Sequence, residues 1–233
     1  MVLSLADVPI WLVLGFGFAL GLEHALEADH VVAVSAIVSQ QKKLWKSSLV
    51  GIVWGIGHTA TLFLVGIIVL FLSISIPQEL ILSFEFLVGV VILLLGVLVL
   101  RSAVTVKIHL HRHSHGDQTH IHLHSHKEGD SHHHIHRSLI LGMVHGIAGS
   151  GALMLLVLST VESITAGITY ILLFGVGSIL GMLILSAVIG LPFIITANKL
   201  GNMNRIIQAI AGVVSICIGA FIMYQTSSIL VSI

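Results

Sequence analysis

Long apolar runs, separated by short polar stretches, dominate the pattern of hydrophobic and polar positions along the 233-residue chain. A helix needs roughly 20 apolar residues in succession to cross the hydrocarbon core of a bilayer. Runs of that length predict six membrane-spanning helices, near 9–38, 47–72, 82–101, 138–160, 166–191 and 205–230. The pattern therefore predicts an all-α membrane protein whose surroundings are the lipid bilayer.

The composition supports a membrane protein and excludes several other classes. Hydrophobic residues make up 56% of the chain and charged residues only 9%, whereas soluble domains carry about 25% charged residues. The formal net charge of zero argues against nucleic acid as a partner. The single cysteine, Cys217, has no second cysteine with which to form a disulfide within the chain.

The basic residues give the predicted helices a direction across the membrane. All ten lysines and arginines lie between the first and second, the third and fourth, or the fifth and sixth predicted spans. The positive-inside rule makes that face cytoplasmic. We therefore expect a multi-pass protein of the cytoplasmic membrane with both termini on the extracytoplasmic side.

The two halves of the chain resemble each other at an offset near 120 residues. Three segments match in the same order: "GLEHALEADH" with "GMVHGIAGSG", "GIGHTA" with "GVGSIL", and "GVVILLLG" with "GVVSICIG". Three spans per half is an odd number, so the second copy must be inverted, as in many secondary transporters. We expect two three-helix repeats, residues 1–106 and 138–233, joined by a cytoplasmic segment, residues 107–137.

One stretch of the first span, "GLEHALEADHVVAV", is unusually rich in ionisable groups. Within eight residues it holds Glu23, His24, Glu27, Asp29 and His30. A charge at the bilayer centre costs about 3 kcal/mol on insertion scales, so these groups need compensation. None of the predicted spans carries a lysine or arginine in its interior. The acids therefore pair with histidines, lie at the membrane interface, carry protons, or bind a metal ion.

Histidines inside the spans favour the metal alternative. Besides His24 and His30, the spans hold His58 in "WGIGHTATLF" and His145 in "GMVHGIAGSG". A lone buried histidine is usually a hydrogen-bonded core residue, but four of them with carboxylates and no cysteine form a ligand set for Ni²⁺, Co²⁺, Zn²⁺, Fe²⁺ or Mn²⁺. We expect the metal site to involve these histidines together with Asp29, Glu27 and Glu23.

Helical geometry leaves two alternatives for Asp29. On a continuous helix, Glu23, Glu27 and His30 share one face, whereas Asp29 points roughly 100° away from His30. Either Asp29 orients a histidine from outside the ligand set, or the helix is broken at this point. The preceding glycines favour a break; they are Gly15, Gly17 and Gly21.

These motifs resemble those of the prokaryotic nickel/cobalt transporters. "HALEADH" is similar to the H-x4-D-H signature of that family, and "GHTA" resembles its G-H-S/T motif. "GMVHGIAGSGALMLL" looks like the fourth span of six-span, urease-associated nickel permeases of the wider superfamily. The resemblance implies His24, Asp29, His30 and His58 as metal-site residues. The chain departs from the eight-span members at Glu23, where they usually carry arginine.

Twelve of the sixteen histidines lie in residues 107–137. This composition predicts a disordered, metal-binding segment. A set of histidine boxes of the desaturase type is the alternative, but it would need rigid helices. We expect the segment to be an accessory site that tunes transport; its histidines are His109, His111, His113, His115, His120, His122, His124, His126, His132, His133, His134 and His136.

Together these features predict transport of Ni²⁺ or Co²⁺ rather than an enzymatic activity. No G-x4-G-K-[ST] loop for ATP is present, so potential-driven uptake is the expected mode. Efflux by proton exchange is the first alternative; a membrane metalloenzyme or a metal donor without transport is less favoured. No cofactor is expected beyond the transported metal. The expected partners are a cytoplasmic metal chaperone or metalloenzyme maturation proteins.

Overall fold

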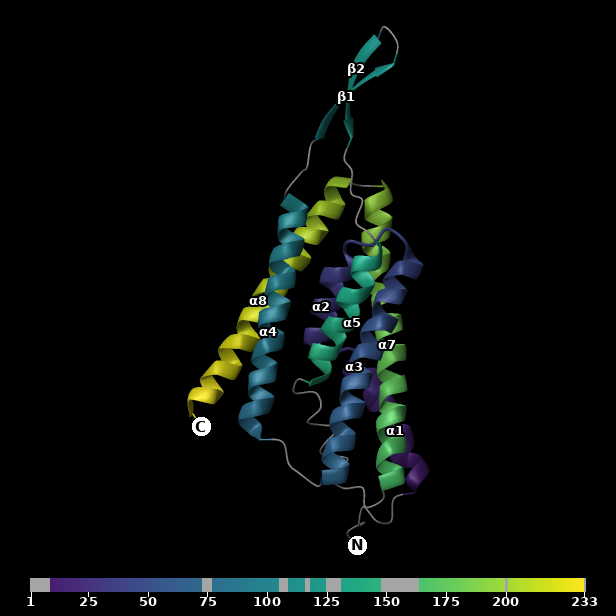
Figure 1. Cartoon of the computed structure of the whole chain (residues 1–233), viewed down its shortest axis with the longest axis vertical. Coiled ribbons are helices and arrows are strands. Elements are labelled where there is room, and N and C mark those ends of the chain that lie inside the picture. The colour runs from purple at the N-terminus through teal and green to yellow at the C-terminus, as the bar shows by residue number, and fades with distance from the viewer. Residues whose placement is uncertain are drawn as a thin grey trace.

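The computed structural model describes residues 9–72, 77–104, 109–115, 118–124, 131–147, 164–199 and 201–232. Helices form the body of the molecule, and a two-stranded hairpin extends from one end of it (Figure 1). In chain order the elements are α1 Ile10–His24, α2 Ala28–Val38, α3 Leu44–Leu72, α4 Gln78–Val104, β1 His109–His115, β2 Gln118–His124, α5 Ser131–Ile147, α7 Ile164–Lys199 and α8 Gly201–Ser232.

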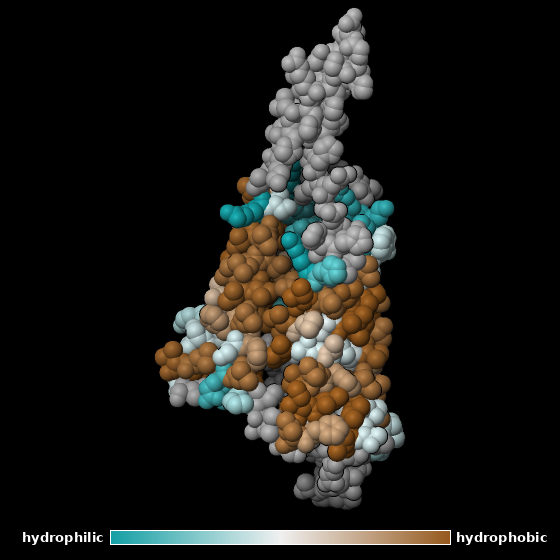
Figure 2. Space-filling model, in the orientation of Figure 1, coloured by the Kyte–Doolittle hydropathy of each residue, from teal (hydrophilic) through white to brown (hydrophobic). Residues whose placement is uncertain are grey.

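Four of the described helices, α3, α4, α7 and α8, are long and apolar enough to cross a membrane. Their outer faces expose large apolar side chains, among them Phe71, Leu94 and Phe221, which lipid can cover. Figure 2 shows apolar residues over most of one face, while hydrophilic residues gather beneath the hairpin. The molecule is therefore a multi-pass membrane protein, as the hydropathy pattern predicts.

The first predicted span is two helices, which confirms the broken-helix alternative. α1 ends at His24 and α2 begins at Ala28. The chain turns through hydrogen bonds from Leu26 N–H to the Glu23 carbonyl (2.8 Å) and from Glu27 N–H to the His24 carbonyl (3.1 Å). Glu27 is then extended, with φ −60° and ψ 148°, which ends the helical path. The break therefore falls within the ionisable stretch and not at the glycines that precede it.

The histidine-rich segment differs from the predicted disorder. Strands β1 and β2 pair antiparallel, and the register places His109 opposite His124, His111 opposite His122, and His113 opposite His120. Histidines alternate here with other residues, and a period of two is the pattern of a strand. The predicted fourth span also shifts, because α5 already begins at Ser131; residues 148–160 of that prediction lie outside the described residues.

The helices pack as two groups joined by α2. In one group α3 contacts α5 and α7, and α1 contacts α7; in the other, α4 lies along α8. The short helix α2 contacts α3, α4, α7 and α8, so it connects the groups. Its buried residues Val32, Val34 and Val38 belong to a core cluster that also contains Trp54 of α3 and Ile92 of α4.

Glycines set the spacing of these helices, because their missing side chains let backbones touch. A Cβ on Gly51 of α3 would overlap the Met182 carbonyl and the Ser186 hydroxyl of α7. A Cβ on Gly96 of α4 would approach the Gly212 carbonyl of α8 to 2.7 Å. Both crossings therefore depend on the absence of a side chain.

A polar clasp fixes the far end of α2 to α7 and α8. Gln208 donates from Nε2 to the Ser39 carbonyl (2.9 Å) and to Asn204 Oδ1 (2.8 Å). Asn204 in turn donates from Nδ2 to the Phe193 carbonyl (2.8 Å) and to Thr196 Oγ1 (3.1 Å). Ser39, Thr196, Asn204 and Gln208 are all buried, so these bonds replace those that water would supply.

Gly51→Ala tests the close crossing of α3 and α7. The added methyl group must push the helices apart, and overpacking of this kind costs about 1–3 kcal/mol. We expect a lower midpoint of thermal unfolding in detergent. Gly15→Ala is the matched control, because a Cβ on Gly15 meets nothing within 4 Å; equal midpoints for the two variants would contradict the packing argument.

Candidate metal centre

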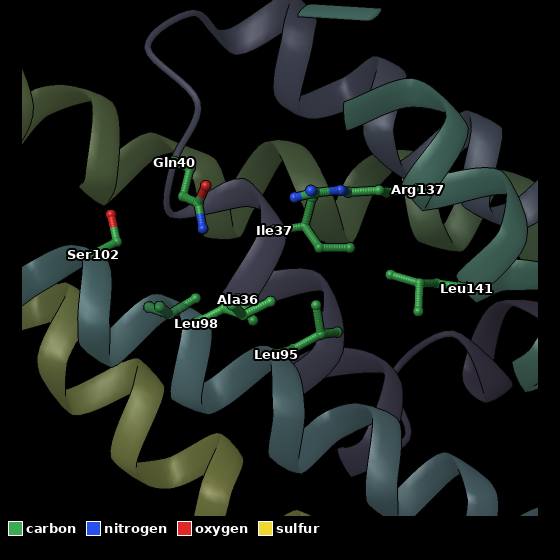
Figure 3. A pocket seen from close by; sticks show the side chains of 9 residues that line it. Ala36, Ile37, Gln40, Leu95, Leu98, Ser102, Arg137 and Leu141 are labelled. Atoms are coloured by element: carbon green, nitrogen blue, oxygen red, sulfur yellow. The ribbon is translucent and has the colours of Figure 1, made fainter. Parts of the chain in front are cut away.

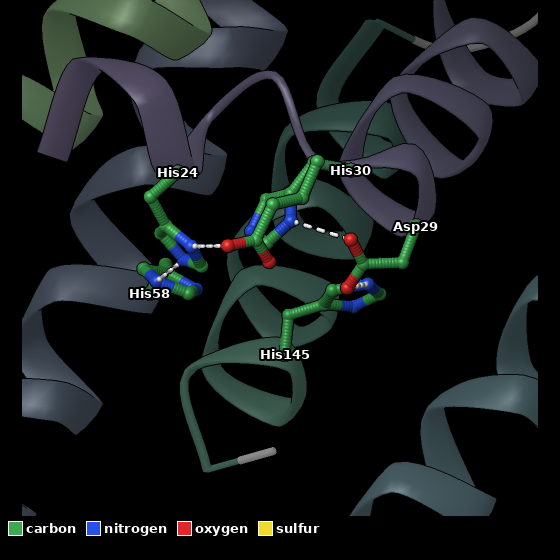
Figure 4. A network of polar contacts seen from close by, with 6 residues as sticks. His24, Asp29, His30, His58 and His145 are labelled. Carbon is green, nitrogen blue, oxygen red and sulfur yellow. Dashed lines mark hydrogen bonds and ion pairs between the residues drawn. The ribbon is translucent and has the colours of Figure 1, made fainter. Parts of the chain in front are cut away.

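Five side chains from four helices converge at the break between α1 and α2. His24 ends α1, Asp29 and His30 lie in the first turn of α2, and His58 and His145 come from α3 and α5 (Figure 4). The four histidines are at most 4% exposed. Carboxylates are favoured at helix N-termini, so the break provides a place for Asp29 in an apolar setting. The sequence predicted all five as site residues.

The imidazole rings of the four histidines lie close to one another. His24 Nε2 and His58 Nε2 are 2.9 Å apart. Ring centroids of His30 lie 4.6 Å from His24, 5.1 Å from His58 and 5.1 Å from His145. With metal–nitrogen bonds of about 2.0–2.1 Å, two ligand nitrogens of a tetrahedral site stand about 3.3 Å apart. A cation therefore requires only small shifts of His24 and His58.

The ligand atoms form two groups of three. One group consists of His24, His30 and His58, and the other of Asp29, His30 and His145; within each, the ligand atoms lie within 4.8 Å of one another. His30 belongs to both groups. Imidazole with or without a carboxylate suits first-row divalent metals such as Ni²⁺, Co²⁺ and Zn²⁺.

Two carboxylates lie close to three of the rings. Asp29 Oδ1 lies 3.0 Å from His30 Nδ1, and its Oδ2 lies 3.5 Å from His145 Nε2. Glu27 Oε1 lies 2.9 Å from His24 Nδ1. A carboxylate on one ring nitrogen fixes the tautomer and leaves the other nitrogen free for a metal.

Several ring nitrogens are buried without a hydrogen-bond partner among the described residues. These are His30 Nε2, His58 Nδ1, and both nitrogens of His145. Buried polar atoms are normally paired, and each unpaired one needs an explanation. A bound cation would satisfy one nitrogen of each ring, so the residues present fit a metal ion.

The remaining predicted site residues lie at or beyond the edge of this cluster. Glu27 is 40% exposed and touches the cluster through His24. Glu23 is exposed and belongs to neither group of three. Of the accessory histidines, those from His109 to His124 lie on the hairpin strands, and His132, His133, His134 and His136 lie in α5; His126 is outside the described residues.

Two buried aromatic side chains lie against the histidine rings. The sequence did not single them out. Trp54 of α3 lies 5.0 Å from the His145 ring, and Phe174 of α7 lies 5.4 Å from the His24 ring. Both are buried. Inside apolar runs these two residues look like any other core positions, so the sequence carried no signal for them.

A separate cavity of about 210 Å³ lies between α2, α4 and α5 (Figure 3). Its lining is mainly aliphatic, with Leu95, Leu98 and Leu141, and Arg137 contributes a guanidinium. Apolar walls and a positive charge do not suit a cation. The buried histidine cluster is therefore the better candidate for binding a metal ion.

Comparison with known proteins identifies relatives of the whole chain. Residues 30–221 match the protein family described as cytochrome C biogenesis protein transmembrane region. The chain is 44% identical over 219 residues to the urease accessory protein UreH of Bacillus sp. (strain TB-90), which covers 94% of this chain and 93% of that protein. No solved structure matches the chain.

Glu27→Gln tests whether the carboxylate orients His24. Loss of such a partner typically weakens metal binding by about 10- to 100-fold, and we expect a change of that size for Ni²⁺ or Co²⁺ in isothermal titration. The control is Glu23→Gln, four residues earlier and exposed, which should bind like the unaltered protein. Equal affinities for the two variants would remove Glu27 from the site.

Proposed function

Because the chain belongs to the family of the cytochrome c biogenesis transmembrane region and of urease accessory protein UreH, we propose that it transports Ni²⁺ or Co²⁺ into the cell. The observation that carries the proposal is the cluster of four buried histidines and Asp29 at a helix break in the apolar part of the molecule. Intramembrane ionisable groups of this kind mark ion pathways. The relative is named for urease. In this chain, the H-x4-D-H motif from His24 to His30 resembles the motif of nickel/cobalt transporters.

The proposed architecture is six spans in two inverted three-helix repeats, set in the cytoplasmic membrane with the basic face inside. Equivalent contacts support the repeat. A Cβ on Gly21 would overlap the Phe174 carbonyl, and one on Gly142 would overlap the Trp54 carbonyl. Gly142 follows Gly21 by 121 positions, and Phe174 follows Trp54 by 120. The pairs Gly57 with Leu139 and Gly177 with Phe18 are related in the same way.

The proposed mechanism uses the cluster as the substrate site. Imidazoles of His24, His30 and His58 replace water around the incoming cation, while Asp29 supplies negative charge. Rocking of the two repeats about this site then opens it toward the cytoplasmic side. There the histidine-rich hairpin, residues 109–124, receives the ion and passes it to a chaperone or maturation protein.

The membrane potential supplies the driving force in this proposal. A divalent cation moving inward gains about 4.6 kcal/mol at 100 mV, twice the value for a single charge. Export by the same fold would oppose this gradient and would need proton exchange, for which Glu23 and Glu27 are the candidates. A thiol–disulfide transfer role would need paired cysteines, and the chain has one.

Nickel flux into proteoliposomes tests the proposed function. We expect entry to follow an imposed inside-negative potential and to be insensitive to a pH gradient. His30→Ala should abolish entry, because His30 lies at the centre of the cluster. Cys217→Ala is the control, since Cys217 is exposed on α8. Flux that requires an opposing proton gradient would indicate an exporter, and normal flux in His30→Ala would refute the site.

The hairpin provides a separate prediction about the accessory histidines. The register places histidines opposite one another on the two strands, and imidazole is a common metal ligand. Replacing residues 109–124 with a Gly/Ser linker of equal length should lower the number of Ni²⁺ ions bound per chain. Flux at saturating external metal should stay unchanged, because the substrate site is intact. An unchanged metal count by elemental analysis would contradict the accessory role.

A further inference from the structure

We infer that the metal centre is two overlapping cation subsites that share His30, and that a single ion passes from one subsite to the other during transport. This inference rests on the proposed function. The imidazole subsite consists of His24, His30 and His58. The carboxylate subsite consists of Asp29, His30 and His145.

Each subsite has three potential ligands gathered close together. In both groups, the three ligand atoms lie within 4.8 Å of one another, so inward shifts of the side chains would bring them around one ion. The imidazole subsite draws on α1, α2 and α3, whereas the carboxylate subsite draws on α2 and α5. The carboxylate subsite therefore joins the N-terminal part of the chain to the C-terminal part.

His30 is placed to serve both subsites. Its ring centroid is 5.1 Å from that of His58 on one side and 5.1 Å from that of His145 on the other. Its Nδ1 contacts Asp29, and its Nε2 is buried without a partner among the described residues. An ion bound to His30 can exchange its other ligands while it keeps at least one ligand in the apolar interior.

His145 does not have the contacts of a structural histidine. It is 1% exposed, and neither ring nitrogen makes a hydrogen bond within the described part of the chain. Asp29 Oδ2 lies 3.5 Å from the Nε2 atom of His145. A ring held only for packing would leave two polar atoms unsatisfied, whereas an ion between Asp29 and His145 would use one of them.

The two subsites are occupied in turn and not together. They share a ligand and lie within one cluster of touching rings, so two divalent cations would repel each other strongly in a low-dielectric interior. They also differ in charge, because one is made of neutral imidazoles and the other contains a carboxylate. Movement of the ion toward Asp29 therefore exchanges imidazole ligands for a negative charge.

His145→Ala and His58→Ala separate the subsites in two measurements, of which the counting of ions uses the chain with residues 109–124 replaced by the linker. The first is X-ray absorption and Co²⁺ absorption spectroscopy in detergent, which counts imidazole ligands and bound ions. The second is Ni²⁺ flux in proteoliposomes. Met143→Ala is the matched control, because Met143 lies on the same helix and is 45% exposed.

We expect the unaltered protein to bind one ion at the centre, counted with residues 109–124 replaced by the linker. His145→Ala should keep one ion with the three-imidazole signature, yet lose flux by about 10-fold or more, as loss of a metal contact does. His58→Ala should lose that signature and retain an ion with mixed imidazole and carboxylate ligands. Met143→Ala should match the unaltered protein in both measurements.

Four results would overturn the inference: two ions at the centre, normal flux in His145→Ala, loss of all bound metal in folded His145→Ala, or no bound metal in folded His58→Ala. His145→Gln, which retains a polar side chain, replaces His145→Ala if the latter fails to fold. Absence of flux in the unaltered protein would instead refute the proposed transport, and the spectra of the variants would still decide whether two subsites exist.

Discussion

The interruption between α1 and α2 determines how polar groups can gather inside this apolar molecule. On one continuous helix, with about 100° between successive residues, His24 would point roughly 140° away from Asp29. The turn at Ala25–Glu27 lets the end of one helix and the start of another face the same point. His24 is presented by the first and Asp29 and His30 by the second. The carboxylate also gains from its position in the first turn of α2.

The other histidines reach this point because α5 lies directly against α3. A Cβ on Gly146 would approach the His58 carbonyl, and one on Gly142 would overlap the Trp54 carbonyl. The backbones therefore touch on both sides of His145. Its ring is held beside Trp54 and faces Asp29. The glycine contacts that bring α5 against α3 therefore also position His145 in the cluster.

The sequence singled out the residues of the buried cluster, but not their arrangement. Ionisable groups in apolar runs are costly, so His24, Asp29, His30, His58 and His145 stand out without a structure. Hydropathy likewise identified the long helices α3, α4, α7 and α8. The exposed position of Glu23, the pairing of Glu27 with His24 and the exact end of α1 depend on contacts between distant segments. The hairpin was missed because its alternating histidines were interpreted as a disordered, metal-binding repeat and not as the pattern of a strand.

The hydrogen bond at Ser39 couples the movement of α2 to that of α8. One end of this eleven-residue helix is bonded through Gln208 to α8, and the other end is separated from α1 by a non-helical turn. A rigid helix bonded to α8 at one end moves with α8. Displacement of α8 relative to α1 would therefore move Asp29 and His30, which lie in α2, relative to His24, which belongs to α1.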